Sequence, residues 1–298
     1  MDLALAFDAT YAAHAAVVMS TAADEMPGTH LRFWLVAADD VDEPTRAALT
    51  RAAGPTATVS FLQVDLARAA LPISHNATLQ YISAAMFLRL LIPDAVPEGV
   101  DRLLYLDCDV LCTDSLAPLL EVDLAGAPLG AVRDVYTRRL VDMGGLPGLA
   151  GYRELDPQAT YFNSGVLLID VPRWKECDVT GRSLDYVARH SHESRFPDQD
   201  ALNHAVYGNW LRLPSRYNHM LGGRLEPAFG GKLSDAALIH SAGPVKPWHP
   251  TFPDCARRQL YWAHRARHPE LGVHRHRRRR MSAPARPTST EATTTSPA

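Results

Sequence analysis

The stretch LLYLDCDVLCTD, residues 103–114, decides the fold class and marks a candidate site. Its apolar start, residues 103–106, predicts a strand that is buried on both faces and ends at Asp107 and Asp109. Side chains two residues apart in a strand share a face, so both carboxylates project the same way, while Cys108 points toward packing. Two such carboxylates repel each other unless a cation or hydrogen-bond donors compensate them. Three interpretations stay open here: acids solvated in a loop, a site for a hard cation, or an aspartyl-phosphate hydrolase with Asp107 as nucleophile.

Length and composition indicate a globular protein. The chain has 298 residues, of which 47% are hydrophobic and 21% charged, enough to bury a sizeable core. Residues 1–20 are apolar but contain no basic region, so we expect neither a signal peptide nor a segment that spans a bilayer. The four cysteines lack the spacing of a zinc site, which favours reduced thiols in the cytoplasm.

Charge is distributed unevenly along the chain, whose formal net charge is −3. Residues 257–280 contain nine arginines and one acid, Glu270, so an acidic body is followed by a basic segment. The basic segment indicates an anionic partner. Because Tyr261 and Trp262 lie among the arginines, we favour a membrane surface over nucleic acid. Residues 281–298 are a low-complexity tail of Ser, Thr, Pro and Ala that we expect to be disordered.

Apolar strands alternate with helical stretches over the first two thirds of the chain. We expect strands at 3–7, 31–37, 58–64, 101–110, 127–135 and 162–171, and helices at 11–23, 44–53, 79–92, 180–191 and 198–207. This alternation predicts an α/β protein with a Rossmann-like, mainly parallel twisted sheet flanked by helices. Ligands bind such sheets at the carboxyl ends of the strands. Asp8, Asp107, Asp109 and Asp134 each fall at such an end.

Two polar stretches later in the chain are candidates for contacts with a ligand. In FNSGVLLID, residues 162–170, we expect Asn163, Ser164 and Gly165 to precede a buried strand. The glycine would let the backbone approach a ligand closely, and the asparagine offers both a donor and an acceptor to a polyhydroxy substrate. In PDQDALNHAV, residues 197–206, acids lead into a helix, which ordinary capping also explains.

The stretch LIHSAGPVKPWH, residues 238–249, combines features of an anion site. An apolar lead-in places His240 at a strand end, and the following Ser-Ala-Gly turn brings backbone N–H groups near an anion. Lys246 then adds a point charge suited to phosphate. A lone histidine is usually structural, but a histidine and a lysine beside two aspartates favour a binding site.

Taken together, these stretches resemble glycosyltransferase family 8, the retaining sugar-nucleotide transferases that include glycogenin and bacterial lipooligosaccharide α-galactosyltransferases. The resemblance lies, in family order, in AFDATYAAHA (6–15), FLRLLI (87–92), LYLDCDVL (104–111), LGAVRD (129–134), FNSGVLLID (162–170), DQDALN (198–203) and HSAGPVKPWH (240–249). The last stretch is the most specific. It displaces the aspartyl-phosphatase interpretation, which has no use for H-x-x-G-x-x-K-P-W.

The resemblance implies a GT-A fold that binds a UDP-sugar and Mn²⁺, with Mg²⁺ as the other candidate ion. It assigns the metal to Asp107, Asp109 and His240, a set of carboxylates and an imidazole that suits Mn²⁺. It assigns donor binding to Ala6, Asp8, Thr10, Arg89, Cys108, Asp134, Asn163, Ser164, Gly243 and Lys246. It assigns catalysis to Asp198, Gln199 and Lys246. Ala9 and Thr10 depart from the residues that relatives often have at these positions.

The implied activity is transfer of galactose or glucose from a UDP-sugar to a hydroxyl group of a glycan, glycolipid or lipopolysaccharide-type saccharide, with retention. Because Gln199 is a poor nucleophile, front-face attack is favoured over double displacement. We expect a catalytic domain over residues 1–252, a basic segment over residues 253–280 and a cytoplasmic location, peripheral on the inner membrane face. The alternatives are a D-x-D metal-dependent phosphatase and a non-catalytic sugar-nucleotide-binding protein. The Gly-rich residues 142–160 adjoin the expected acceptor side.

Overall fold

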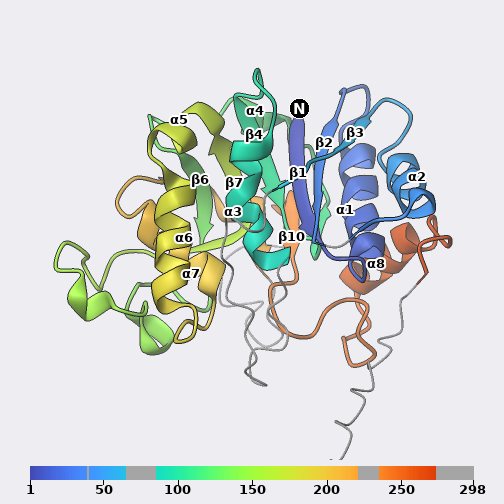
Figure 1. Ribbon diagram of the computed structural model, residues 1–298. Helices are drawn as coiled ribbons and strands as arrows, with labels where there is room; N and C mark the ends of the chain where they lie inside the picture. Colours follow the sequence, from blue (N-terminus) through green and yellow to red (C-terminus); the bar gives the residue numbers. More distant parts are fainter. Residues whose placement is uncertain (39, 65–84, 221–234, 273–298) are drawn as a thin grey trace, which may run out of the picture.

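A seven-stranded sheet forms the centre of the chain in a computed structural model that describes residues 1–38, 40–64, 85–220 and 235–272 (Figure 1). The strand order is β3-β2-β1-β4-β7-β6-β8. These strands are β1 (Asp2–Phe7), β2 (Arg32–Ala37), β3 (Thr58–Phe61), β4 (Arg102–Leu106), β6 (Leu129–Arg133), β7 (Phe162–Asp170) and β8 (Leu211–Arg212). Neighbours pair in parallel except at β7, which is antiparallel to both β4 and β6. The predicted mainly parallel α/β sheet is therefore confirmed.

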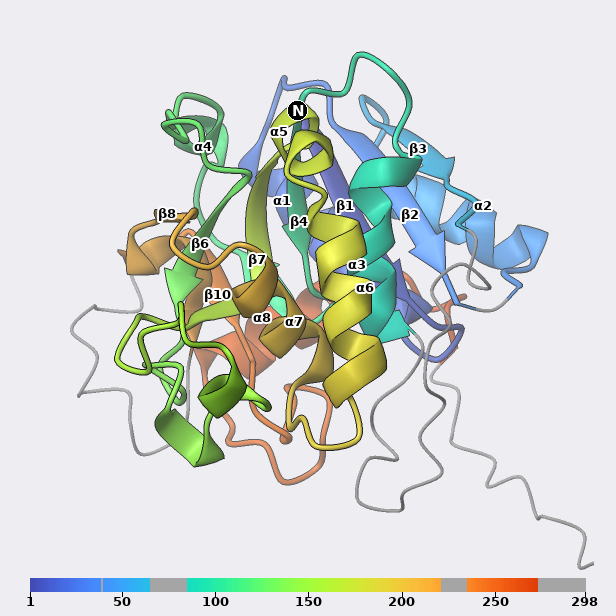
Figure 2. The same ribbon diagram turned by 60° about the vertical axis from the view of Figure 1, so that its left-hand side comes forward.

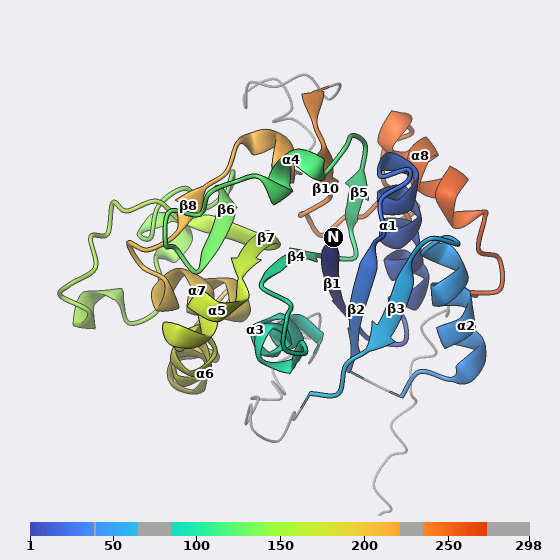
Figure 3. The same cartoon turned by 90° about the horizontal axis from the view of Figure 1, so that it is seen from above.

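Helices cover both faces of this sheet, and the alternation along β1 shows why. Leu3, Leu5 and Phe7 pack in a core with α1 and α2, whereas Ala4 and Ala6 pack in a second core with the helices opposite. Figures 2 and 3 show α1, α2 and α8 on one side and α3, α5, α6 and α7 on the other. The helices are α1 (Ala12–Glu25), α2 (Glu43–Ala52), α3 (Ala85–Ala95), α4 (Ala117–Leu120), α5 (Val171–Glu176), α6 (Val179–His190), α7 (Pro197–Ala205) and α8 (Ala256–Arg265).

A second, three-stranded sheet carries His240 to the end of β4. Its order is β5-β10-β9, with β5 at Val110–Cys112, β10 at Leu238–His240 and β9 at His219–Met220. In the antiparallel pair of β10 and β5, His240 lies opposite Val110. The N–H of Ser241 also donates to the carbonyl of Asp109 at 3.0 Å. Short 3-10 helices occur at Asp142–Gly144, Leu149–Gly151 and Ser215–Asn218.

Two details of the sequence prediction are wrong. The strand expected over 101–110 is two strands, because the chain turns at Asp107 after β4 and enters the other sheet with β5. Asn163, Ser164 and Gly165 lie inside β7 rather than before it. Since β7 runs against its neighbours, its first residues nevertheless lie at the edge where β4 and β6 end. The predicted helix at 79–92 is observed as α3, and residues 79–84 lie outside the described part.

The described part of the basic segment packs on the domain. The Tyr261 hydroxyl lies 2.7 Å from Nδ1 of His14 in α1, and Arg267 pairs with Asp24 at 2.6 Å. Tyr261 is buried, so its expected role at a membrane surface is wrong, whereas Trp262 is 38% exposed. The amphipathic pattern of α8 does not predict what its apolar face packs against. In the structure that face packs against α1. The helices within the described ranges are too short or too polar to cross a membrane.

Asn203 fixes α7 to the first residue of β7, so its loss should be costly. Its Nδ2 donates to the carbonyl of Phe162 and its Oδ1 accepts from the N–H of Phe162, both at 2.9 Å. Asn203→Ala leaves these buried peptide groups without partners and should lower the free energy of unfolding by about 2–5 kcal/mol. Urea denaturation measures the change. Asn209→Ala, at an exposed position, should change it by less than about 0.5 kcal/mol, and an equally small effect at Asn203 would contradict the assignment.

Candidate active site

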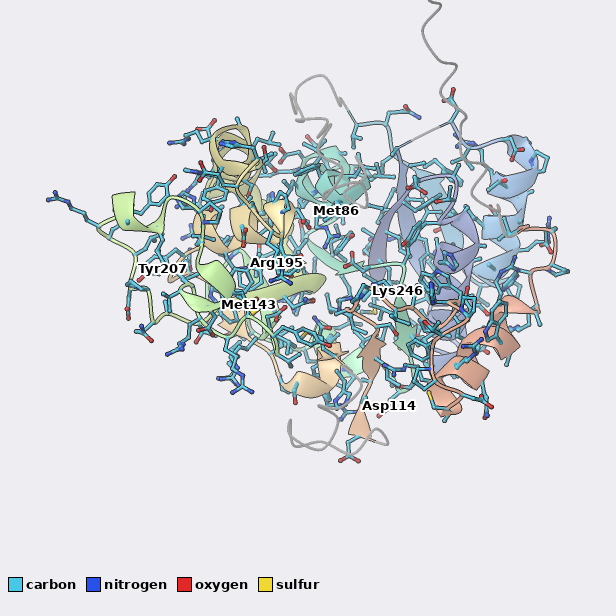
Figure 4. The ribbon with its side chains drawn as sticks, turned by 90° about the horizontal axis from the view of Figure 1, so that it is seen from below. Met86, Asp114, Met143, Arg195, Tyr207 and Lys246 are labelled. Atoms are coloured by element: carbon cyan, nitrogen blue, oxygen red, sulfur yellow. The ribbon has the colours of Figure 1, made fainter. Side chains whose placement is uncertain are left out.

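Asp107, Asp109 and His240 form one cluster at the carboxyl edge of the sheet. One ligand atom from each lies within 4.8 Å of the others. Nε2 of His240 is 3.1 Å from Oδ1 of Asp109 and 3.9 Å from Oδ2 of Asp107. The two carboxylates lie together as predicted, but they do so in the turn after β4 and not on one face of a strand. Figure 4 looks onto this edge, where Lys246 lies near the middle of the view.

Gly165 makes room for this cluster. A Cβ atom on Gly165 would lie 2.2 Å from Cε1 of His240 and 2.8 Å from Oδ2 of Asp107. The glycine carbonyl also accepts from the N–H of Asp107 at 2.8 Å. The sequence predicts a close approach of this backbone to a ligand, and the structure shows a close approach to two protein side chains.

Arg89 on α3 compensates the acids from one side. Its guanidinium lies 2.9 Å from Asp107 and 3.1 Å from Asp198, and it donates to the Ser164 carbonyl at 3.1 Å and hydroxyl at 3.0 Å. Burial raises the pKa of Asp198, Arg89 opposes that rise, and the nearby charge of Asp107 adds to it. Tyr105 also donates to Asp107 at 2.7 Å, from the same face of β4. Asp107 therefore has a hydroxyl donor and a cation within reach.

Lys246 compensates the second acid from the loop after β10. Its ammonium contacts Oδ2 of Asp109 and donates to the carbonyl of Ser241 at 2.8 Å. Burial alone would raise the pKa of Asp109, but Lys246 and His240 outweigh it and hold the pKa below its usual value. Gly243, in the same loop, has no atom within 4 Å of the position that a Cβ would take. This loop thus places a cationic side chain, Lys246, beside Asp109 and leaves the backbone at Gly243 uncovered.

Asp134, Asn163 and Gln199 form a second polar group beside the cluster. Oδ2 of Asp134 accepts from Asn163 at 3.0 Å and from Gln199 at 3.4 Å. Oε1 of Gln199 accepts from the N–H of Ser164 at 2.9 Å. All of these side chains are buried. The structure therefore brings together residues from the ends of β6, β7 and α7 that lie far apart in the sequence.

Asp8, Ala6 and Cys108 lie on the other side, at the end of β1. Oδ1 of Asp8 accepts from the N–H of Thr10 at 2.9 Å, from its hydroxyl at 2.6 Å and from the N–H of Tyr11 at 3.2 Å. The thiol of Cys108 points to the Ala6 carbonyl at 3.4 Å and is buried in the core, as its alternation predicts. The Cys108 side chain is therefore turned away from the cluster of acids.

Tyr11, His14 and Trp248 connect the turn after β1 to the Lys246 loop. The rings of His14 and Trp248 stack at 3.7 Å, and Tyr11 meets Trp248 edge-on at 5.9 Å. Burial lowers the pKa of His14 to about 3, so its imidazole is neutral. Sequence reasoning missed these contacts, although Tyr11 lies three residues after Asp8 and Trp248 two residues after Lys246.

Sequence reasoning also missed Tyr105 and Asn218. Tyr105 lies two residues before Asp107, so the strand alternation could have identified it. Asn218 lies at the end of the 3-10 helix Ser215–Asn218, and its side chain contacts both Asn163 and His240 at 2.9 Å. Nothing in the surrounding sequence marks it.

Comparison with known proteins identifies relatives of matching fold. The model of the family described as Glycosyl transferase family 8 matches residues 2–251. Glycosyltransferase GlyF of Streptococcus pneumoniae serotype 4 is 32% identical over 189 residues, which cover 62% of this chain and 42% of GlyF. Lipopolysaccharide 1,2-glucosyltransferase of Escherichia coli is 32% identical over 179 residues, covering 57% of this chain and 51% of that protein. The match thus spans about half the length of these relatives.

Solved structures agree with this relationship. Galactosyltransferase LgtC, determined with donor and acceptor sugar analogs, superimposes with a TM-score of 0.74 at 27% identity, covering 90% of this chain and 96% of LgtC. GlyE of Streptococcus pneumoniae has a TM-score of 0.66 at 22% identity, covering 89% and 60%, and shares the fold. The predicted GT-A fold is confirmed. Because the family model spans residues 2–251 and the motifs converge on one edge of the sheet, the chain belongs to glycosyl transferase family 8.

Proposed function

We propose that this chain is a retaining glycosyltransferase that transfers galactose or glucose from a UDP-sugar to a hydroxyl group of a glycan, glycolipid or lipopolysaccharide-type saccharide. The observation that carries the proposal is the cluster of Asp107, Asp109 and His240 beside Lys246. Two relatives support it by name, one a lipopolysaccharide glucosyltransferase and the other a galactosyltransferase with donor and acceptor analogs bound.

The cluster fits a divalent cation by its donor set. Two carboxylates suit Mg²⁺ or Mn²⁺, and the imidazole favours Mn²⁺. Asp107, Asp109 and His240 would hold the ion, and a bound divalent cation would supply positive charge to the leaving diphosphate. Arg89 and Tyr105 already lie within reach of Asp107, and Lys246 contacts Asp109, so each acid has a cationic partner beside it.

Different groups of surrounding residues would bind the nucleoside, the diphosphate and the sugar of the UDP-sugar donor. Asp8, Thr10 and the backbone of Ala6 and Cys108 would meet the uracil and ribose. Lys246, which contacts Asp109, would bind the diphosphate together with the backbone at Gly243. The donor sugar would lie against three sets of side chains: Arg89 and Ser164, Asp134 and Asn163, and Asp198 and Gln199.

The geometry favours front-face attack as the route to retention. Double displacement needs a carboxylate free to attack the anomeric carbon. Asp198 is buried and paired with Arg89, and Asp134 accepts from Asn163 and Gln199. In front-face attack the bond from the anomeric carbon to the diphosphate breaks, and the acceptor oxygen bonds to that carbon from the same side. The acceptor's proton goes to the leaving phosphate oxygen.

We further propose that residues 1–252 form the catalytic domain and that residues 253–280 are a basic segment. A cytoplasmic protein could use this segment to reach an anionic membrane surface from the inner face. Residues 273–280 of the segment and the predicted disordered tail, 281–298, lie outside the described part of the chain.

A donor screen tests the proposed function. The purified chain is incubated with UDP-galactose, UDP-glucose, their N-acetyl forms and other nucleotide sugars, with Mn²⁺, Mg²⁺ or EDTA, and nucleotide release is measured. We expect slow, Mn²⁺-dependent release of UDP from one hexose donor. Binding of a UDP-sugar without turnover, even with saccharide acceptors added, would favour the non-catalytic alternative. Phosphate release from phosphomonoesters without any UDP-sugar would favour the phosphatase.

Asp109→Asn should abolish metal-dependent donor binding and turnover together. The substitution keeps the shape of the side chain but removes the charge that contacts Lys246 and faces His240. Calorimetric titration with Mn²⁺ in the presence of UDP measures the loss, and Asp123→Asn, at an exposed position, is the matched control. Unchanged Mn²⁺ affinity in Asp109→Asn would reject the ligand assignment.

Gly165→Ala should displace His240 or Asp107, because the added Cβ would lie 2.2 Å from the His240 ring. A displacement of about 1 Å can cost about 100-fold in rate, so we expect a loss of that size in kcat/KM. Gly272→Ala places its Cβ in open space away from the cluster and should leave the rate unchanged. Equal rates for the two variants would show that the contact at Gly165 is unimportant.

Gln199→Ala should lower kcat by about 10²- to 10³-fold but leave measurable turnover, because front-face attack loses a polar contact and not a nucleophile. Single-turnover kinetics measure the remaining rate, with Gln63→Ala, at an exposed position, as the control. Complete loss, together with a sugar trapped on a neighbouring aspartate in the unmodified enzyme, would support double displacement.

A further inference from the structure

We infer that Asn218 is a positioning residue that keeps the proton of His240 on Nδ1 and so directs Nε2 to the metal. The inference rests on the proposed metal site, but the hydrogen bonds that carry it belong to the chain alone. They form a relay from Asp134 through Asn163 and Asn218 to His240. All four side chains are buried, so water has little access to replace a link.

Asp134 fixes the orientation of the first amide. Its Oδ1 accepts from the backbone N–H groups of Tyr136 at 2.7 Å and Thr137 at 2.8 Å. Its Oδ2 lies 3.0 Å from the side-chain nitrogen of Asn163. A carboxylate accepts and cannot donate, so Asn163 must turn its NH₂ group toward Asp134. The Asn163 carbonyl then faces the other way, where the N–H of Gly165 donates to it at 3.0 Å.

The orientation of Asn163 fixes that of Asn218. The carbonyl oxygen of Asn163 lies 2.9 Å from the side-chain nitrogen of Asn218. If Asn218 were flipped, two carbonyl oxygens would face each other in a buried site, and the Asn163 oxygen would keep only the N–H of Gly165 as a donor. Asn218 must therefore turn its own carbonyl to His240, whose Nδ1 lies 2.9 Å from it.

The last link sets the proton position on the imidazole. A carbonyl only accepts, so Nδ1 of His240 must carry the proton that it donates. Nε2, which faces Asp109 at 3.1 Å and Asp107 at 3.9 Å, can donate to these carboxylates in the metal-free chain and is the nitrogen that would give its lone pair to a bound metal. A metal-binding histidine commonly donates its second N–H to such a partner, which orients the ring and selects the ligating nitrogen.

The relay also explains why the site uses two asparagines between a carboxylate and an imidazole. An aspartate at position 163 would repel Asp134, and an apolar residue would leave the N–H of Gly165 without its acceptor. A side-chain amide accepts a hydrogen bond at its oxygen and donates one at its nitrogen. Once one end has a fixed partner, the orientation of the other end is fixed as well. Gly165 both contributes a donor to the relay and leaves space for the ring that the relay orients.

The test compares Asn218→Leu, which removes the acceptor, with Asn218→Asp, which keeps an acceptor for His240 and loses only the donor to Asn163. In metal-free protein labelled with ¹⁵N in the histidine rings, we expect a slowly exchanging Nδ1–H signal of His240, assigned with His240→Gln. The signal should be lost in Asn218→Leu and retained in Asn218→Asp. Mn²⁺ affinity, measured by calorimetry, should fall about 10- to 100-fold in Asn218→Leu, and Asn218→Asp should recover most of that loss.

Three results would distinguish a failure of the proposed hydrogen-bond relay from a failure of the proposed metal site. A His240 ring protonated only on Nε2 in the unmodified protein would overturn the inference without reference to any variant. Mn²⁺ affinity unchanged in a folded Asn218→Leu variant would overturn it as well. An Nδ1–H signal that depends on Asn218, in a protein that binds no Mn²⁺, would support the relay and overturn the proposed metal site instead.

Discussion

Asp107 and Asp109 bring two negative charges to the end of one buried strand, and much of the surrounding structure compensates them. Arg89 reaches Asp107 from α3, Lys246 reaches Asp109 from the loop after β10, and His240 lies between the two carboxylates. Without these groups the desolvated pair would be strongly unfavourable. The same concentration of acid and base at a sheet edge is what a site for a divalent cation and a diphosphate requires.

The antiparallel direction of β7 brings a second group of polar residues to the sheet edge where β4 and β6 end. A parallel β7 would begin at the opposite edge of the sheet, and its polar start would lie far from β4 and β6. Because β7 is antiparallel to both, Asn163 and Ser164 lie where β4 and β6 end, next to Asp134. Asn203 then holds the start of β7 to α7, which places Asp198 and Gln199 beside the same residues. Donor contacts proposed from separate motifs therefore belong to one connected group.

Local sequence predicts the parts of this site that depend on one strand or one turn. The alternation around Asp107 predicts that the two acids lie together and that Cys108 packs inward; the structure shows both, although a turn after β4 and not strand alternation places Asp109. The run to His240 predicts a strand end, which β10 confirms. The pairing of β10 with β5 could not be predicted in this way, because it depends on contacts between distant segments. For the same reason, no local pattern predicts that Gly165 faces His240, that Asn218 faces its ring, or that α1 covers Tyr261.

The measurement that tests the central claim most directly is anomalous diffraction from crystals of the chain with Mn²⁺ and UDP. The account predicts a manganese peak coordinated by Asp107, Asp109 and Nε2 of His240, with the diphosphate on the same ion and Lys246 moved from Asp109 to a phosphate oxygen. A manganese peak elsewhere, or UDP bound with the contact between Lys246 and Asp109 unchanged and no metal in the cluster, would contradict it.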